Sequence, residues 1–239
     1  MRIGNEQMRS LLVPFLLLAA AGSCLAQQAI FNVPSADILE SGKVYLEMDA
    51  AVKIDRTSHF RRFSSFVPRV VVGVGGNVEI GLNIMGNVQP GSDSTTLVPT
   101  VKWKFYESAK NKVALFGGAN VYIPVRNRFY NIGTWSYLAA SKTINKTRLT
   151  AGAFVASKNA FAAKAVRSGG QLSIEHTLNC KVTLAADWIT GRHANGYLTP
   201  GVIYKPHPKV TTYFSYSIGN DRAASGNHYF LFELGYNLN

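Results

Sequence analysis

Apolar and polar residues alternate along most of this chain with a period of two. In the final segment, Phe230, Phe232, Leu234, Tyr236 and Leu238 share one parity, and Tyr229, Leu231, Glu233, Gly235 and Asn237 share the other. Successive side chains of a β-strand point to opposite faces of its sheet. The pattern therefore predicts strands that have one apolar face and one mixed or polar face.

The same alternation predicts twelve strands, over residues 43–54, 65–75, 77–86, 96–106, 112–125, 132–142, 146–157, 169–178, 180–190, 197–205, 209–219 and 228–238. The strand at 132–142 can be read in either register. Six longer connections, at 55–64, 87–95, 126–131, 158–168, 191–196 and 220–227, alternate with five short turns. Strict alternation of long loops and tight turns is typical of an outer-membrane barrel.

The first residues have the composition of an export signal. Two basic residues, Arg2 and Arg9, precede an apolar run at 11–21 that is too short to span a bilayer. Small residues follow, and cleavage after Ala26 would remove residues 1–26 as a signal peptide. Residues 27–41 would then form a periplasmic N-terminal arm, or a short plug in the lumen, ahead of a barrel over 42–239. In a rival interpretation Cys24 is lipidated.

Two further observations narrow the fold class. No stretch after the signal approaches the ~20 continuous apolar residues of a membrane helix, so a membrane-embedded chain would cross as strands. Cleavage after Ala26 leaves Cys180 without a disulfide partner in the chain. We therefore expect an all-β protein, a transmembrane antiparallel up-and-down β-barrel of about twelve strands in the outer membrane. A soluble exported β-barrel or β-sandwich is the alternative fold.

Aromatic residues near the ends of predicted strands agree with a membrane barrel. They are Trp103, Trp135, Trp188, Tyr197, Tyr216 and Tyr236. Rings of tryptophan and tyrosine surround such barrels at the level of the lipid headgroups. The sequence therefore predicts an aromatic girdle that includes these six residues.

If the apolar faces contact lipid, charged residues of the opposite parity line the lumen. These pore-lining candidates are six acids and seven bases: Glu47, Asp49, Glu79, Glu175, Asp187 and Glu233, with Lys53, Arg69, Lys102, Lys104, Arg148, Lys181 and Lys205. Cross-strand neighbours suggest that Glu79 pairs with Lys102 or Lys104, and Glu175 with Lys181. Two interpretations stay open: a lumen filled by ion pairs, and a narrow wet pore that carries both signs of charge.

The chain is strongly basic, with a formal net charge of +12 at pH 7. Because the lumen candidates nearly balance, the excess positive charge falls on the loops, which include Arg61, Arg62, Arg126, Arg128, Arg167 and Arg192. Guanidinium groups form bidentate contacts with phosphate. These arginines therefore predict contact with lipopolysaccharide or, alternatively, an anion-gathering vestibule. The expected partners are outer-membrane lipid, lipopolysaccharide and the barrel-assembly machinery, and no basic–aromatic module for nucleic acid is present.

Catalytic and metal-binding signals in the sequence are weak. His59 with Ser64 or Ser65 is the best candidate for the Ser–His pair of a lipid-modifying barrel enzyme. The five histidines are scattered and one cysteine follows the signal, so no metal-ligand spacing is present. We therefore expect no enzymatic activity, no metal and no cofactor.

The run Phe31-Asn-Val-Pro-Ser-Ala-Asp-Ile-Leu-Glu-Ser-Gly42 leads into the first predicted strand. It resembles the corresponding segment of small porin-like bacterial outer-membrane barrels. The layout of the chain after the signal is similar to theirs as well. The resemblance implies the same barrel fold and the same location.

These observations together predict a porin-like channel for passive or selective diffusion of small polar or anionic solutes through a charged lumen. A closed structural or adhesion barrel, with the basic loops as its working part, is one alternative. A lipid-modifying barrel enzyme is another. The pattern alone does not distinguish an open lumen from a plugged one.

Overall fold

The computed structural model describes residues 29–52, 64–86, 95–126, 131–161, 163–220 and 228–238. The expected signal peptide, with Ala26 and Cys24, lies outside these ranges. The strands are β1 Val44–Val52, β2 Ser64–Gly75, β3 Val78–Gly86, β4 Thr95–Ser108, β5 Val113–Arg126, β6 Gly133–Ile144, β7 Thr147–Ala156, β8 Ser168–Thr177, β9 Val182–Ile189, β10 Tyr197–His207, β11 Val210–Gly219 and β12 Tyr229–Asn237. In the described part of the chain, no helix is long and apolar enough to cross a membrane.

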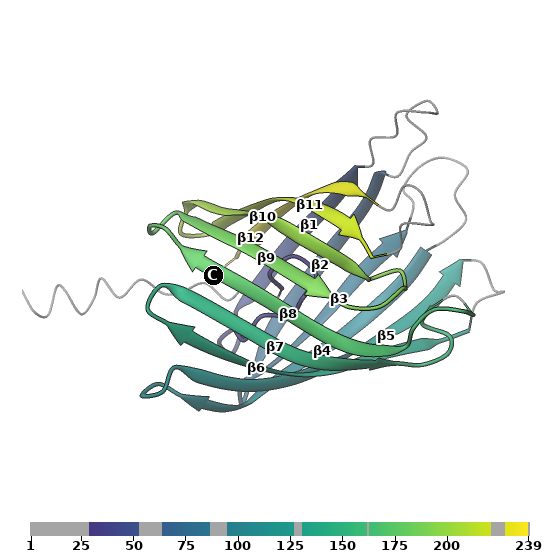
Figure 1. Ribbon diagram of the computed structural model, residues 1–239, viewed down its shortest axis with the longest axis horizontal. Helices are drawn as coiled ribbons and strands as arrows, with labels where there is room; N and C mark the ends of the chain where they lie inside the picture. Colours follow the sequence, from purple (N-terminus) through teal and green to yellow (C-terminus); the bar gives the residue numbers. More distant parts are fainter. Residues whose placement is uncertain are drawn as a thin grey trace, which may run out of the picture.

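All twelve strands form one closed antiparallel barrel (Figure 1). Each strand pairs with its neighbours in the chain, and β1 pairs with β12 to close the sheet. Closure gives every strand two partners, so no strand edge is left to be covered by lipid. The predicted fold class and strand number are confirmed.

The two ends of the barrel differ in the length of their connections. At one end, which we call the turn end, each hairpin reverses within a few residues, and Asn77, Lys112 and Asn145 have φ angles of 59°, 50° and 54°. Asparagine tolerates this left-handed conformation better than most residues, and the conformation suits tight hairpins. The longer connections lie at the other end, which we call the loop end. The start of β1 and the end of β12 lie at the turn end.

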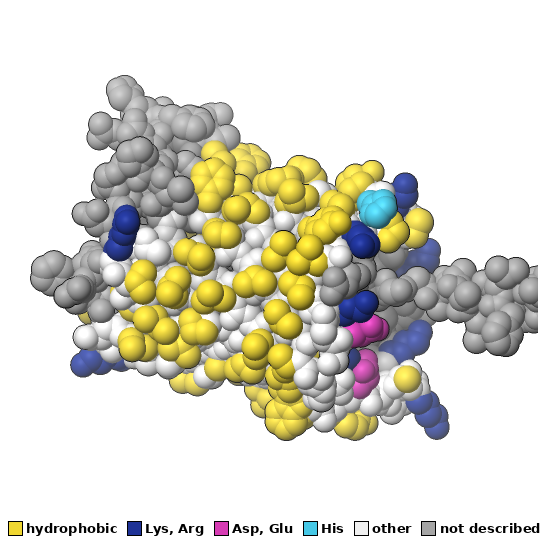
Figure 2. Space-filling model, turned by 180° about the vertical axis from the view of Figure 1, so that it is seen from behind, with side chains coloured by type: hydrophobic (Ala, Val, Ile, Leu, Met, Phe, Trp, Pro, Cys, Tyr) yellow, Lys and Arg dark blue, Asp and Glu magenta, His cyan; other side chains and the backbone are white. Residues whose placement is uncertain are grey.

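The outer surface of the barrel is apolar. Leu138 and Val155 point outward and are 59% and 60% exposed, whereas the inward-pointing Glu233 is 2% exposed. Apolar side chains cover the visible outer face, and the charged side chains gather toward its ends (Figure 2). This distribution is the reverse of a water-soluble protein and matches a wall that faces lipid outside and a polar interior.

The register of β6 corrects one prediction. Trp135 was expected in the aromatic girdle, but it lies inside the barrel at 3% exposure, stacked on Phe154 at a ring-centroid distance of 4.0 Å. Both parities of β6 carry apolar residues, so alternation could not choose between them. Packing with Phe154 on β7 selects the register. Tyr197 was also expected in the girdle, but it faces the lumen, whereas its neighbour Leu198 faces outward. Trp103 and Trp188 do lie on the outer face, at 53% and 40% exposure.

Candidate functional site: the lumen and its N-terminal plug

Residues 29–41, which we call the plug, run inside the barrel before β1 begins. Ile30, Val33 and Ser35 are fully buried there. The plug forms no strand with the wall, and its own backbone is joined by a single bridge between Ala29 and Pro34. These residues therefore lie in the lumen rather than forming a periplasmic arm. The physical reason is that their apolar side chains and backbone amides find partners on the inner wall.

Asp187 on β9 is the first polar anchor of the plug. Its Oδ2 accepts hydrogen bonds from the backbone N–H groups of Phe31, Asn32 and Val33, at 3.0, 2.5 and 2.8 Å. Consecutive N–H groups that converge on one anion form a favourable binding concavity. The side chain of Asn32 also donates to Thr199 Oγ1 at 2.9 Å. A predicted lumen acid thus fixes the tip of the plug to the β9–β10 wall.

Arg148 on β7 is the second anchor. Its guanidinium donates to both oxygens of Asp37 at 2.7 and 3.0 Å, and to both oxygens of Glu175 at 2.6 and 2.8 Å. Burial by itself raises the pKa of Asp37, but the charge of Arg148 and its hydrogen bonds outweigh burial, so this pKa lies below its ordinary value. Two bidentate contacts make Arg148 a planar clamp between wall and plug.

Glu79 on β3 is the third anchor. It accepts a hydrogen bond from the backbone N–H of Leu39 at 3.0 Å and pairs with Lys102 Nζ at 2.8 Å. Glu79 and Lys102 lie directly opposite each other on β3 and β4. The predicted pairing of Glu79 with Lys102 is therefore present. Glu79 also binds the end of the plug nearest to β1, at Leu39.

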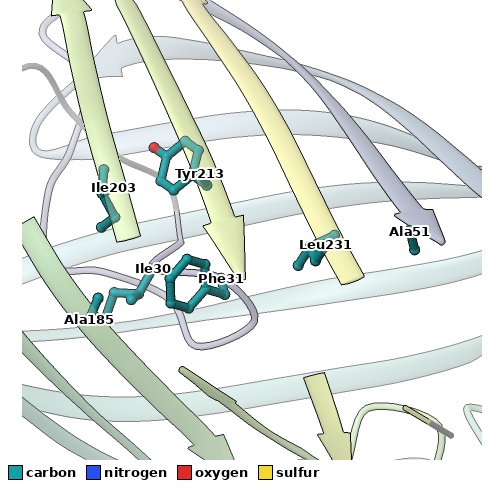
Figure 3. Packing of buried hydrophobic residues seen from close by; sticks show 7 residues of the cluster. All are labelled: Ile30, Phe31, Ala51, Ala185, Ile203, Tyr213 and Leu231. Carbon is teal, nitrogen blue, oxygen red and sulfur yellow. The ribbon is translucent and has the colours of Figure 1, made fainter. Parts of the chain in front are cut away.

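Apolar contacts complete the docking of the plug. Ile30 and Phe31 pack with Ala185, Ile203, Tyr213, Leu231 and Ala51, which come from five strands (Figure 3). Gly201 makes room for this contact, because a Cβ there would lie 2.6 Å from the Phe31 ring. Further along, Val33 packs with Trp135 and Phe154. The plug thus touches the wall on opposite sides of the lumen.

A cluster of three acids with one base lies on β12, β1 and β2. Arg69 contacts Glu47 at 2.5 Å and Asp49 at 3.3 Å, and its Nε donates to Asn83 Oδ1 at 3.0 Å. Glu233 stands directly opposite Asp49 in the β1–β12 register. Oxygen atoms of Glu47, Asp49 and Glu233 lie within 4.8 Å of one another. We refer to these three residues as the acid cluster.

A cavity of about 280 Å³ lies in the lumen beside the plug and reaches toward the loop end. The plug contributes Phe31, Asn32 and Pro34 to its lining. Its walls carry Asp49, Arg69, Asn83, Lys102, Asn120, Tyr122, Tyr137, Asn195, Tyr197, Tyr229 and Glu233, together with apolar residues. Amides, aromatic rings and charges of both signs therefore face the same space.

An aromatic cluster borders the loop end of the lumen. The His193 ring stacks on Phe161 at a centroid distance of 4.6 Å and lies 5.2 Å from Phe154. Its Nε2 lies 2.8 Å from the carbonyl oxygen of Thr190, which accepts a hydrogen bond. Burial lowers the pKa of His193, which favours the neutral ring.

The other lumen candidates lie nearer the turn end. Lys104 pairs with Glu107 at 2.7 Å, Lys205 is half-buried, and Lys181 is exposed in the turn between β8 and β9. Glu175 pairs with Arg148 rather than with Lys181, because Arg148 lies opposite it on β7. That pairing prediction was wrong. Lys53 lies outside the described residues.

Three of the loop arginines can be placed. Arg126 and Arg192 are exposed and Arg167 is half-buried, all at the loop end. Arg61, Arg62 and Arg128 lie outside the described residues. Contact of these arginines with lipopolysaccharide or anions stays a prediction.

A Ser–His catalytic pair would need a histidine hydrogen-bonded to a serine hydroxyl. The hydrogen bonds of the described histidines go to other groups. His176 Nδ1 lies 2.9 Å from Thr147 Oγ1, and Nδ1 of His228 accepts from Gly219 N–H at 3.3 Å. Nδ1 of His207 accepts from Lys209 N–H at 3.2 Å. His59, the best catalytic candidate from the sequence, lies outside the described residues.

Sequence reasoning offered a lumen plug as an alternative to an arm, but it named none of the plug residues as part of the site. Asp37 and Asn32 were not predicted as site residues, because they precede the first strand and alternation assigns no face there. The run of apolar residues within 30–39, broken by Asn32, Ser35 and Asp37, was the available signal. Such a pattern indicates burial against a polar wall rather than an extended arm in water.

No protein-family model matches this sequence, and no characterised protein is detectably similar to it in sequence. Solved structures show the likeness. The KdgM porin in complex with disordered oligogalacturonate has a TM-score of 0.58 and 8% identity, covering 80% of this chain and 98% of that chain. Another KdgM porin structure has a TM-score of 0.54 and 8% identity, covering 81% and 97%.

Outer membrane phospholipase A from Escherichia coli has a TM-score of 0.50 and 12% identity, covering 84% of this chain and 91% of that chain. At such identities the likeness concerns the fold. Together with the apolar outer wall and polar interior, it leads to one conclusion. The chain has the fold of the porin-like β-barrels of the outer membrane.

Proposed function

We propose that this protein is a porin-like channel of the outer membrane for small polar solutes, and that the plug closes its lumen at rest. The observation that carries the proposal is the mode of docking. Three anchors, at Asp187, Arg148 and Glu79, hold the plug across a polar lumen by hydrogen bonds and ion pairs, in addition to its apolar contacts. Each of these contacts can be exchanged for water without breaking a covalent bond.

The inner wall supports a water-filled lumen. On β7 and β8, the side-chain polar atoms Thr150 Oγ1, Ser173 Oγ and both polar atoms of Gln171 are buried without a hydrogen-bond partner in the protein. Buried polar groups in native proteins are nearly always satisfied, and water is the usual partner where protein groups are lacking. A wall built for a dry, fully packed core would carry apolar residues at these positions.

The cavity beside the plug supports a polar solute. Arg69 and Lys102 offer positive charge, and Asp49 and Glu233 offer carboxylates. Asn83, Asn120 and Asn195 offer amide groups that bind hydroxyl or carboxylate oxygens. Aromatic rings at the same cavity provide apolar faces. Small solutes of mixed polarity, anionic ones included, fit this lining. Because a KdgM porin structure contains oligogalacturonate, short acidic saccharides are the first solutes to test.

Conduction then requires displacement of the plug. Once it leaves, Asp187, Arg148, Glu175, Glu79 and Lys102 line the path with both signs of charge. Facing charges of opposite sign set up a field across the pore that selects among polar solutes. The competing hypothesis, a permanently closed structural barrel, predicts that the plug never moves.

A reversible lock tests the proposal. In a Cys180→Ser background, Ala36→Cys on the plug and Ala139→Cys on β6 place two thiols in the apolar cluster to which both alanines belong. Planar-bilayer recordings should show current from the unlinked protein and none after a short thiol-specific cross-linker joins the pair. A reducible linker should restore the current on reduction.

A second variant makes the test decisive even if the wild-type plug rarely leaves the lumen. Asp187→Ala removes the acceptor of three backbone N–H groups and should raise the open fraction in the same recordings. Absence of current from folded wild-type, Asp187→Ala and a barrel lacking residues 29–40 would refute the channel. Equal current before and after cross-linking would refute the role of the plug while keeping the channel.

A further inference from the structure

The acid cluster has a charge that its protein neighbours do not balance. Two of its acids are almost completely buried, Glu47 at 5% and Glu233 at 2% exposure, and Asp49 is partly buried. Arg69 is the base that contacts Glu47 and Asp49. When all three carboxylates are ionised, one guanidinium leaves two negative charges within a buried group. Buried charges in proteins are paired or coordinate a metal ion, because removal from water is otherwise too costly.

The strand register makes this imbalance unusual. Asp49 and Glu233 are direct partners in the β1–β12 ladder, and Glu47 is the direct partner of Arg69 in the β1–β2 ladder. Like charges directly opposite each other destabilise a sheet, whereas the Glu47–Arg69 pair is the favourable arrangement. The same few residues therefore contain one ideal cross-strand pair and one repulsive pair.

Unpartnered oxygens point to what is missing. Oε1 of Glu233 and Oδ1 of Asp49 are buried and have no hydrogen-bond partner in the protein. Arg69 does not supply one, since its hydrogen bonds are directed at Oε1 of Glu47, Oδ2 of Asp49 and Oδ1 of Asn83. Glu47 is satisfied by Arg69 and by the Tyr45 hydroxyl, which donates to its Oε2 at 2.5 Å. The unfilled acceptors thus belong to the two acids that face each other.

We propose that the acid cluster binds one hard divalent cation, with Ca²⁺ as the best match. Carboxylate oxygens from all three residues lie within 4.8 Å of one another, so a single ion can contact each of them. Calcium prefers oxygen ligands, tolerates irregular geometry and accepts water at its remaining positions. Two positive charges also match the two that the cluster lacks.

Access to the site comes through the lumen. Asp49, Arg69 and Glu233 line the cavity beside the plug, so an ion can arrive from the loop end and water can complete its coordination. Binding would join β12 and β1 at the seam where the barrel closes. The cation thereby stabilises the closing strand pair, whether or not the barrel conducts.

Terbium luminescence tests the site directly. Tb³⁺ replaces Ca²⁺ at oxygen sites and emits when a nearby tyrosine is excited, and Tyr45 is hydrogen-bonded to Glu47. The folded full-length barrel, stripped with a chelator and held in a zwitterionic detergent without lipopolysaccharide, should show saturable emission at one ion per chain. Ca²⁺ should displace it, and calorimetry with CaCl₂ alone should give the same stoichiometry.

Matched variants decide the outcome. Glu233→Gln and Asp49→Asn keep the side-chain shapes and should each weaken Ca²⁺ binding at least tenfold. Glu107→Gln, an exposed acid in the turn-end hairpin at 57% side-chain exposure, should bind as the wild type does. If the wild type shows no stoichiometric Ca²⁺ binding, or if Glu107→Gln reduces it as much as Glu233→Gln, the proposal is refuted. None of these measurements depends on conduction, so they fail or succeed independently of the channel.

Discussion

Asp187 and Glu233 are both acids of the inner wall, and both are almost completely buried, at 1% and 2% exposure. Their surroundings are opposite. Asp187 receives three backbone N–H groups from the plug, whereas Glu233 faces a second acid across the β1–β12 pair and keeps an oxygen without a partner. Similar burial of the same functional group therefore has two different consequences.

The difference shows how this barrel uses lumen charge. Where the plug docks, backbone dipoles of the same chain stabilise the carboxylate, so Asp187 serves to hold a segment in place. Where the barrel closes, the chain provides one guanidinium for three acids, so Glu233 awaits an external cation. Pore-lining acids that look equivalent in the sequence thus divide into a structural anchor and a proposed binding site.

The largest expected effect follows from removing the anchor. Asp187→Ala leaves three buried N–H groups without an acceptor and should weaken plug docking by about 3 kcal/mol, which is roughly 100-fold. The measurement is the rate at which maleimide labels Ala36→Cys in the Cys180→Ser background, since Ala36 is 6% exposed when docked. An unchanged labelling rate would show that Asp187 does not hold the plug.

The second anchor should give a smaller effect. Arg148→Gln leaves Asp37 and Glu175 without their shared cation, and we expect plug docking to weaken by about 2 kcal/mol, or roughly 30-fold in the same labelling rate. Glu107→Gln serves as the control, because its exposed carboxylate lies at the turn end and does not contact the plug residues that are described. Equal rates for both variants would contradict the role of Arg148.

Replacing Glu233 and Asp187 by their isosteric amides should change the free energy of unfolding in opposite directions. In the presence of a chelator, Glu233→Gln relieves repulsion with Asp49 and should raise the free energy of unfolding by about 1 kcal/mol. Asp187→Asn should lower it by about 2 kcal/mol, because an amide N–H₂ group would face the plug amides. Guanidinium unfolding followed by tryptophan fluorescence measures both. Effects of the same sign would remove the distinction between the two sites.

Acid pH should produce the smallest effect, at His193 in the aromatic cluster of the loop end. The pKa of His193 is lowered by burial, so its stabilising contribution is complete above the ordinary histidine value of about 6.5 and is lost as pH falls through the folded-state pKa. The pKa of Asp37 is lowered below 3.8, so its anchor persists through this range.

Tryptophan emission between pH 7 and pH 5 measures this effect. Trp135 emission, isolated by Trp103→Phe and Trp188→Phe, should change because Trp135 lies 5.7 Å from the His193 ring. His193→Gln should abolish the change in emission. An emission change that persists in His193→Gln would show that another group is responsible.

Most of the barrel could be predicted from the sequence because a strand has a side-chain period of two. Alternation located all twelve strands, assigned Glu47, Glu79, Asp187 and Glu233 to the interior, and paired Glu79 with Lys102 across neighbouring strands. It could not choose a face for Trp135, where both parities are apolar. It also assigned no face to residues 29–41, which precede the first strand.

The sequence by itself determined which side chains turn inward, since each tight hairpin and each alternating segment is a local property of the chain. The tertiary structure decided which of those side chains meet. Arg148 and Asp37 are 111 positions apart and come together because the plug folds back through the lumen. Asp49 faces Glu233 because closure of the barrel fixes the register between the first strand and the last. Contacts set by closure and docking depend on the whole ring of strands, and no local pattern encodes them.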